Sequence, residues 1–240
     1  MRRIAAVITA TLILSAPVFA ADDLDNIGGL SQTQFRLLSE DLGAALSYKA
    51  LTPAEPTGVT GFDIGIEATA TRLQNTNAFS IATSGSSLDV LPLVKVHVHK
   101  GLPLDFDIGA FYSTVPDSNI AAWGGELRYA FIKGGTATPA VAVRASYSAL
   151  TGVNQISLNT TGIDLSISKG FAFLTPYAGV GNVWVSSTPD NSIITLQKEN
   201  FTLFKYFVGL NMNFAVLNIA IEADKTGDAA SYGLKLGWRF

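Results

Sequence analysis

The 240-residue chain contains no cysteine, which excludes disulfide bonds, a lipid anchor on an N-terminal cysteine and metal sites built from thiolates. Charged residues make up only 15% of the chain, and lysine and arginine form no basic stripe. A nucleic-acid partner is not expected, because such proteins need a basic patch. No nucleophile elbow, phosphate-cradling loop or metalloprotease motif is present. We therefore predict no enzymatic activity, no catalytic residue, no metal and no cofactor.

Long apolar runs are also missing, although the chain is apolar on average. Hydrophobic residues make up 48% of the sequence, and the mean hydropathy is +0.32. After residue 20 there is no run of 18 apolar residues, which a membrane-spanning helix would need. A transmembrane β-barrel reconciles these observations, because alternate residues of each strand face lipid and the interior.

Residues 1–20 have the three parts of a secretory signal. Arg2 and Arg3 form a positive start, residues 4–14 are apolar, and Val18 and Ala20 are small residues where signal peptidase cleaves. A membrane anchor is the alternative, but the apolar stretch is short for a spanning helix. We predict cleavage after Ala20, which takes the formal charge from −3 to −5 because Arg2 and Arg3 are lost.

The last eleven residues alternate strictly between apolar and polar side chains, which is typical of a strand with one apolar face. The apolar positions are Tyr232, Leu234, Leu236, Trp238 and Phe240. This segment resembles the closing strand of Gram-negative outer-membrane β-barrels; the alternative is an edge strand of a soluble sheet. In that family such an aromatic C-terminal strand is the signal read by the barrel-assembly machinery. The resemblance implies the bacterial outer membrane as location, a monomer, and membrane lipid, the assembly machinery and periplasmic chaperones as partners.

Alternation of this kind recurs along the mature chain and predicts an all-β fold, a transmembrane antiparallel up-and-down β-barrel. About 10 strands are expected, with 8 or 12 as alternatives. The connections near residues 74–88 and 187–200 are the longest, and those between them alternate short and long, which fits short periplasmic turns and long outer loops. The expected strands are 61–73, 89–100, 104–115, 120–133, 138–149, 158–169, 172–186, 201–214, 216–224 and 230–240.

Residues 21–60 form a separate N-terminal segment ahead of the barrel at 61–240. Ser31 and Gln34 make a capping box, the apolar residues Phe35, Leu38 and Leu42 share one helical face, and Gly43 can end the helix. This short helix is either a periplasmic plug or hatch that covers or enters the lumen, or it packs loosely beside the first strand. Residues 43–49 could alternatively be a further strand.

Two resemblances bear on this segment. Residues 41–49, followed by 61–65, resemble uncharacterised Gram-negative outer-membrane proteins, which implies no substrate. The helix is similar to the hatch of the long-chain fatty-acid transporters. The chain departs from that second family in having fewer strands and a charged lumen.

Charged residues recur at the polar positions of the predicted strands, where they face the lumen. Acids and bases nearly balance, and a barrel of this size is narrow, so opposite charges are expected to pair across the interior. Two interpretations follow: an ion-paired structural core, or a polar conduit for small solutes. The residues are Glu67, Lys95, Glu126, Arg128, Arg144, Asp164, Lys205, Glu222 and Lys235.

The two histidines, His97 and His99, stand across a predicted turn at 101–103 from Asp105 and Asp107. Imidazole opposite carboxylate could form a catalytic pair, a metal site or a pH-sensitive latch. Cross-strand charge pairing at the periplasmic rim is the simpler expectation.

Taken together, these patterns favour a non-enzymatic outer-membrane barrel, either structural or a narrow pore with an ion-paired lumen. The alternatives are a transporter or channel for a small or hydrophobic solute, gated by the N-terminal segment, and a barrel enzyme acting on lipid or peptide.

Overall fold

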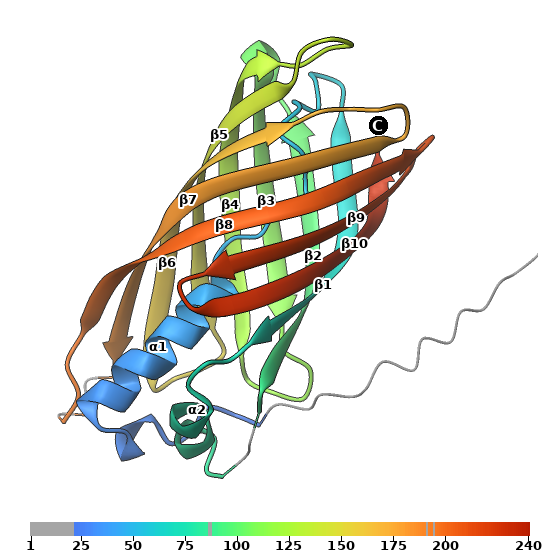
Figure 1. The fold of residues 1–240 in the computed structure, drawn as a ribbon. Helices are drawn as coiled ribbons and strands as arrows, with labels where there is room; N and C mark the ends of the chain where they lie inside the picture. Colours follow the sequence, from blue (N-terminus) through green and yellow to red (C-terminus); the bar gives the residue numbers. More distant parts are fainter. Residues whose placement is uncertain (1–21, 86–87, 191, 194) are drawn as a thin grey trace, which may run out of the picture.

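Ten antiparallel strands follow one another around a closed barrel, and β1 pairs with β10 to complete the wall (Figure 1). The computed structural model describes residues 22–85, 88–190, 192–193 and 195–240, so the predicted signal and its cleavage site lie outside the described residues. The up-and-down ten-strand barrel is confirmed. The strands are β1 (Phe62–Arg72), β2 (Val90–Gly101), β3 (Phe106–Thr114), β4 (Ala121–Lys133), β5 (Ala140–Thr151), β6 (Ile156–Ser168), β7 (Leu174–Pro189), β8 (Glu199–Phe214), β9 (Leu217–Thr226) and β10 (Ala229–Arg239).

The period-two pattern decides which side chains face outward. In β10, Leu234, Leu236 and Trp238 are 48%, 55% and 60% exposed, whereas Lys235 between them is fully buried. Backbone hydrogen bonds between Phe62 and Phe240 join the two ends of the wall. The outer face of the wall is therefore apolar, which is what a bilayer requires.

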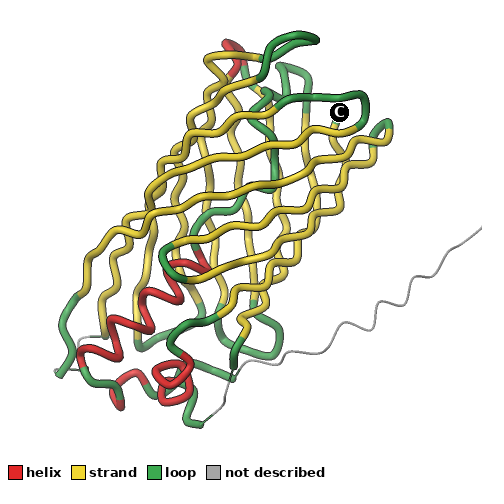
Figure 2. The backbone as a smooth tube through the Cα atoms, in the orientation of Figure 1, coloured by secondary structure: helices red, strands yellow, loops and turns green. Residues whose placement is uncertain are grey.

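The two ends of the barrel differ. The C-terminal end, where Phe62 and Phe240 meet, has short turns, whereas the loop end carries the long connections after β1 and β7. Figure 2 shows the two α-helices towards the end opposite the C-terminus. The helix α2 (Thr76–Ala82), which the sequence analysis missed, lies in the first of these long connections.

The strand β3 begins two residues later than predicted. Leu104 has a left-handed φ of 63° and belongs to the 3₁₀ turn η2 (Pro103–Asp105), so β3 starts at Phe106. The turn between β2 and β3 is therefore longer than the sequence indicated, and this matters for the histidines below.

The helix α1 (Gln32–Leu46) lies inside the loop-end half of the barrel. Its capping box at Ser31 forms as expected, and Phe35, Leu38 and Leu42 are completely buried. The helix continues past Gly43 instead of ending there. A Cβ at Gly43 would lie 2.8 Å from Val185 Cγ2 on β7, so this glycine lets the helix approach the wall. Residues 43–49 add no further strand.

After α1 the chain runs through the lumen to the C-terminal end, where β1 begins (Figure 1). Residues 41–54 are all buried. The segment before α1, which includes the 3₁₀ turn η1 (Ile27–Gly29), is bonded to the loop end. There Leu24 N–H donates to Asn119 Oδ1 (3.0 Å) and Asp25 N–H donates to Ala82 O (3.1 Å).

Loose packing of the helix beside the first strand was therefore a wrong expectation, because α1 is buried inside the barrel. Residues 22–60, which we call the N-terminal segment, start at the loop end and cross the lumen. None of the helices in the described part of the chain is long and apolar enough to span a membrane.

Candidate functional site: the plugged lumen

The lumen has an apolar part and a charged part. Near the loop end, α1, α2 and η1 pack against the inner wall through completely buried side chains such as Phe35, Phe79 and Ile27, which join a cluster that includes Leu91 of the wall. Further towards the C-terminal end the interior is filled by ionisable side chains instead. The sequence pattern indicated the charged part, and the apolar part became visible only once the helices were placed inside the barrel.

All nine predicted lumen residues lie on the inner face, and each is at most 7% exposed. Most of them contact an opposite charge or a backbone carbonyl of the N-terminal segment. Their positions follow directly from the alternation of each strand, because every second side chain must point inward.

Four of these residues form a chain of ion pairs across β4, β5, β6 and β8. Arg144 Nε lies 2.6 Å from Glu126 Oε2, and Arg144 NH1 lies 3.6 Å from Asp164 Oδ2. Lys205 Nζ reaches the same Asp164 oxygen at 3.6 Å and donates to the Tyr48 carbonyl at 2.6 Å. The wall network is thus bonded to the N-terminal segment through Lys205.

Arg128 makes the most extensive contact between wall and segment. Its guanidinium donates to Asp107 Oδ2 (3.0 Å) on β3, to Thr52 Oγ1 (3.1 Å) and to the Pro53 carbonyl (2.6 Å). Thr57 N–H in turn donates to Asp107 Oδ1 (2.9 Å). Because Arg128 and Asp107 are both buried, each charge depends on the other for compensation.

The remaining lumen residues complete the pattern. Lys95 pairs with Glu67 and donates to the Lys49 carbonyl, and Lys235 lies 2.8 Å from Asp63 Oδ2. Glu222 was expected to pair with a basic side chain. Instead it accepts a hydrogen bond from the Tyr177 hydroxyl at 3.0 Å.

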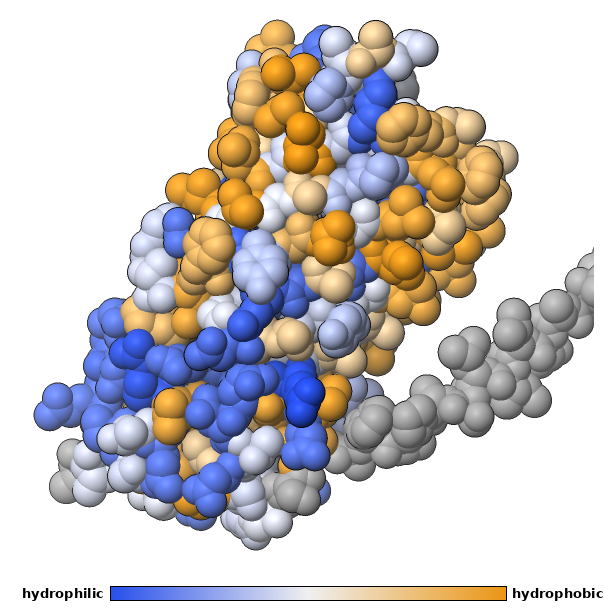
Figure 3. Space-filling model, in the orientation of Figure 1, coloured by the Kyte–Doolittle hydropathy of each residue, from blue (hydrophilic) through white to orange (hydrophobic). Residues whose placement is uncertain are grey.

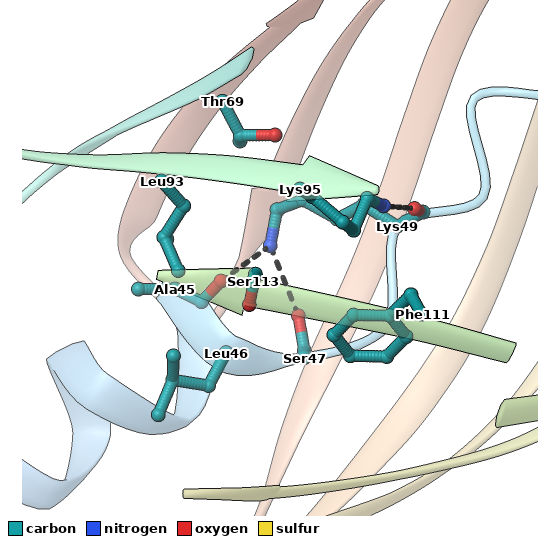
Figure 4. Close-up of a pocket in the computed structure, with 9 residues that line it drawn as sticks. All are labelled: Ala45, Leu46, Ser47, Lys49, Thr69, Leu93, Lys95, Phe111 and Ser113. Carbon is teal, nitrogen blue, oxygen red and sulfur yellow. Dashed lines mark hydrogen bonds between the residues drawn. The ribbon is translucent and has the colours of Figure 1, made fainter. Parts of the chain in front are cut away.

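Figure 4 shows Lys49 of the segment, just after α1, and Lys95 of β2, which donates a hydrogen bond to the Lys49 carbonyl. Lys49 Nζ turns back to the end of the helix and donates to Ala44 O (2.7 Å) and Ser47 Oγ (3.1 Å), so it caps carbonyls that lack helical partners. The gap beside these lysines, lined also by Leu93 and Phe111, has a volume of about 20 Å³, room for about one water.

The histidines do not pair with Asp105 and Asp107, so that prediction was wrong. Because η2 lengthens the turn, Asp107 lies opposite Gly101 and His99 lies opposite Gly109. Asp107 pairs with Arg128, and Asp105 pairs with the exposed Lys133 at 2.9 Å.

The structure places His97 between two other carboxylates. Its Nε2 is 3.1 Å from Asp63 Oδ1 and its Nδ1 is 2.8 Å from Glu67 Oε1. An imidazolium protonated on both nitrogens satisfies both neighbours at once. Asp63, His97 and His99 also bring one potential metal ligand each within 4.8 Å, but a metal there would have to break the His97 and Lys235 contacts of Asp63.

His99 Nε2 hydrogen-bonds the Tyr48 hydroxyl at 2.8 Å, and Glu126 Oε1 lies 3.6 Å from the same nitrogen. In a catalytic relay the nucleophile and the carboxylate contact opposite nitrogens of the imidazole ring. Here Tyr48 and Glu126 both lie next to Nε2. The three side chains are buried, so this arrangement joins the segment to the wall without presenting a nucleophile to solvent.

Sequence reasoning missed Tyr48, Lys49, Asp63, Tyr177 and Asp224 as lumen residues. Asp63 had the inward alternation of its strand as a signal, and so did Tyr177 and Asp224. Tyr48 and Lys49 had none, because only the path of the segment brings them inside. The predicted assembly residues Tyr232, Leu234, Leu236, Trp238 and Phe240 all face outward.

No known family model matches the sequence, and no curated protein matches it. Solved structures that are similar include the N-terminal β-barrel domain of Pseudomonas aeruginosa OprF, at 18% identity over 76% of this chain and 99% of that chain, with a TM-score of 0.37. The KdgM porin, solved with disordered oligogalacturonate, is 7% identical over 74% of this chain and 99% of that chain (TM-score 0.41). Neisserial surface protein A is 12% identical over 75% and 95%, respectively (TM-score 0.31). The similarity is one of barrel architecture only.

Proposed function

We propose that this chain is an outer-membrane β-barrel that its own N-terminal segment keeps closed, and that its role is structural and non-enzymatic. The observation that carries the proposal is the filled lumen. The segment crosses the barrel from the loop end to the C-terminal end, and residues 41–54 on its path are buried throughout. A channel open at rest would need a continuous water-filled path instead.

Three features support the outer membrane as the location. Residues 1–20 have the pattern of a cleaved secretory signal. The outer face of the wall is apolar, as lipid requires. The closing strand ends in an exposed aromatic residue, Phe240, as it does in the barrels that this chain resembles. In this location the C-terminal end faces the periplasm and the loop end faces outward.

One observation favours a second candidate, a gated passage for a small polar solute. The contacts between segment and wall on the charged side include hydrogen bonds from Lys95, Arg128 and Lys205 of the wall to backbone carbonyls of the segment. Such contacts can be exchanged for water, and a displaced segment would leave a charge-lined path. The same charges disfavour a hydrophobic solute.

The test uses a cross-link between plug and wall. Ser39 on α1 and Ser187 on β7 place their hydroxyls 2.7 Å apart, and the chain has no cysteine of its own. Conductance in planar bilayers is measured for the wild type and for the double variant Ser39→Cys/Ser187→Cys, oxidised and reduced. The matched control, Thr71→Cys/Ser231→Cys, cross-links two wall strands whose hydroxyls are 3.0 Å apart.

A closed structural barrel gives no conductance in any of these proteins. Channel openings in the wild type that vanish only in the oxidised plug-to-wall variant, and return on reduction, would establish the gated passage in its place. Steady conductance that the plug-to-wall cross-link leaves unchanged would contradict both candidates.

A further inference from the structure

The outer face of β6, β7 and β8 carries a shallow groove near the loop end, with a volume of about 400 Å³. Trp184, 43% exposed, lies at its centre. On the neighbouring strands Trp184 faces Thr161 on one side and Thr202 on the other. An indole ring flanked by hydroxyls is therefore presented outward from the wall.

The next row towards the loop end is also polar and uncharged. Ser186 follows on β7, and it lies opposite Asn159 on β6 and Asn200 on β8. None of the side chains that line this groove carries a charge. Its hydroxyls and amides can both donate and accept hydrogen bonds, but they offer no cation to a phosphate.

A second, separate groove lies on the same strands further towards the C-terminal end. It has a volume of about 520 Å³, and its lining includes Leu165, Ile167, Ala178, Val180 and Tyr206. On β7, Val180 and Trp184 are four residues apart, about 13 Å along the strand. The polar groove and the apolar groove thus lie on the same face, separated by the outward row of Ile163, Asn182 and Phe204.

The depth of the polar groove in the membrane follows from strand length. β7 and β8 have 16 residues each, whereas about 9–11 residues suffice to cross the hydrocarbon core. Figure 3 shows hydrophilic residues gathered over the loop end and more apolar surface over the rest of the face in view. Trp184 and its neighbours lie near the loop end of these long strands. That position corresponds to the interface between lipid tails and headgroups, where tryptophan is enriched.

We propose that this face of β6–β8 binds a membrane lipid with an uncharged sugar headgroup. The sugar hydroxyls bond to the threonine, serine and asparagine side chains, and the apolar face of the sugar ring packs on Trp184. The acyl chain lies in the apolar groove beside Val180 and Tyr206. The inference rests on the proposed membrane location. It goes beyond that location by naming the class of lipid that this face of the barrel binds.

The experiment measures lipid retention by the full-length barrel in a detergent without a sugar group. Diglucosyl diacylglycerol and phosphatidylcholine with the same acyl chains compete for the protein, and native mass spectrometry counts each bound lipid. We expect wild type to prefer the glycolipid by about tenfold, equivalent to about 1.4 kcal/mol. Trp184→Leu keeps apolar bulk but removes the ring, so the preference should fall to about twofold or less. Trp123→Leu is the control, because Trp123 is similarly exposed, at 52%, and lies on β4 away from the groove.

Equal retention of the two lipids by the wild type would overturn the proposal, and so would an equal loss in both tryptophan variants. Displacement of the glycolipid by free maltose at the same concentration would show that the site recognises the sugar without the acyl chains. That result would contradict a lipid-binding site. Heat-modifiable migration on gels establishes that each variant is folded. A folded, non-conducting barrel without lipid preference would refute this inference and leave the proposed function standing.

Discussion

Replacement of Arg128 tests whether the lumen is held by mutually dependent buried charges. The side chain is 2% exposed and joins Asp107 of the wall to Thr52 and Pro53 of the N-terminal segment. Arg128→Met keeps much of the aliphatic length but leaves the Asp107 carboxylate buried, with Thr57 N–H as a remaining donor. Removing one partner of a buried pair costs about 3–5 kcal/mol, so we expect the free energy of unfolding to fall by that amount.

The second variant separates the stranded charge from lost packing. Asp107→Asn removes the negative charge but keeps an oxygen for Thr57 N–H, so Arg128→Met/Asp107→Asn should be more stable than Arg128→Met alone. The control is Lys133→Met on the same strand, β4. Its pair with Asp105 is 2.9 Å long, but Lys133 is 67% exposed, so the loss should be about 0–1 kcal/mol.

The assay is urea-dependent unfolding from phosphatidylcholine vesicles, followed by tryptophan fluorescence. Equal losses for Arg128→Met and Lys133→Met would refute the argument that burial makes the Arg128 pair critical. A double variant no more stable than Arg128→Met would show that the stranded Asp107 charge is not the cause.

Three further predictions concern topology, assembly and the histidines. An epitope tag placed before Asp22 should be labelled by antibody on intact cells, because the N-terminal segment starts at the loop end; labelling only after the outer membrane is opened would reverse the orientation. Deleting Phe240 should lower the amount of barrel in the outer membrane, because Phe62 and Phe240 close the wall, and normal levels on membrane fractionation would contradict the assembly role. His97→Ala should lower the free energy of unfolding in the same urea assay by about 3–5 kcal/mol, because Asp63 and Glu67 both lose a buried partner, whereas Asp105→Asn should cost less than about 1 kcal/mol; similar values for the two would restore the rim pairing that the structure replaced.

The histidine pairing shows where local reasoning stops. The sequence analysis assumed a tight turn at 101–103, which would put the aspartates opposite the histidines. Leu104 and Asp105 instead adopt left-handed φ values of 63° and 62°, and the longer turn shifts the register. Cross-strand partners can be predicted only if the strand boundaries are known, because a change in register alters every cross-strand partner.

Strand order, the inward set of charges and the outward aromatic C-terminus follow from the sequence by itself. Period-two alternation is a local property of each strand, and it assigns Glu67 or Lys235 to the inner face whatever the rest of the chain does. The capping box at Ser31 is equally local, since its two partners are three residues apart.

The tertiary structure alone decided what fills the barrel and which charges meet. Arg144 meets Glu126 and Asp164, and Arg128 meets Pro53, because strand tilt, register and diameter set distances across the lumen. The amphipathic pattern of α1 predicted that one side of the helix is buried, but it did not indicate which surface that side packs against. Only closure of the wall around the segment supplied apolar contacts on its loop-end side and lysine and arginine donors for its carbonyls.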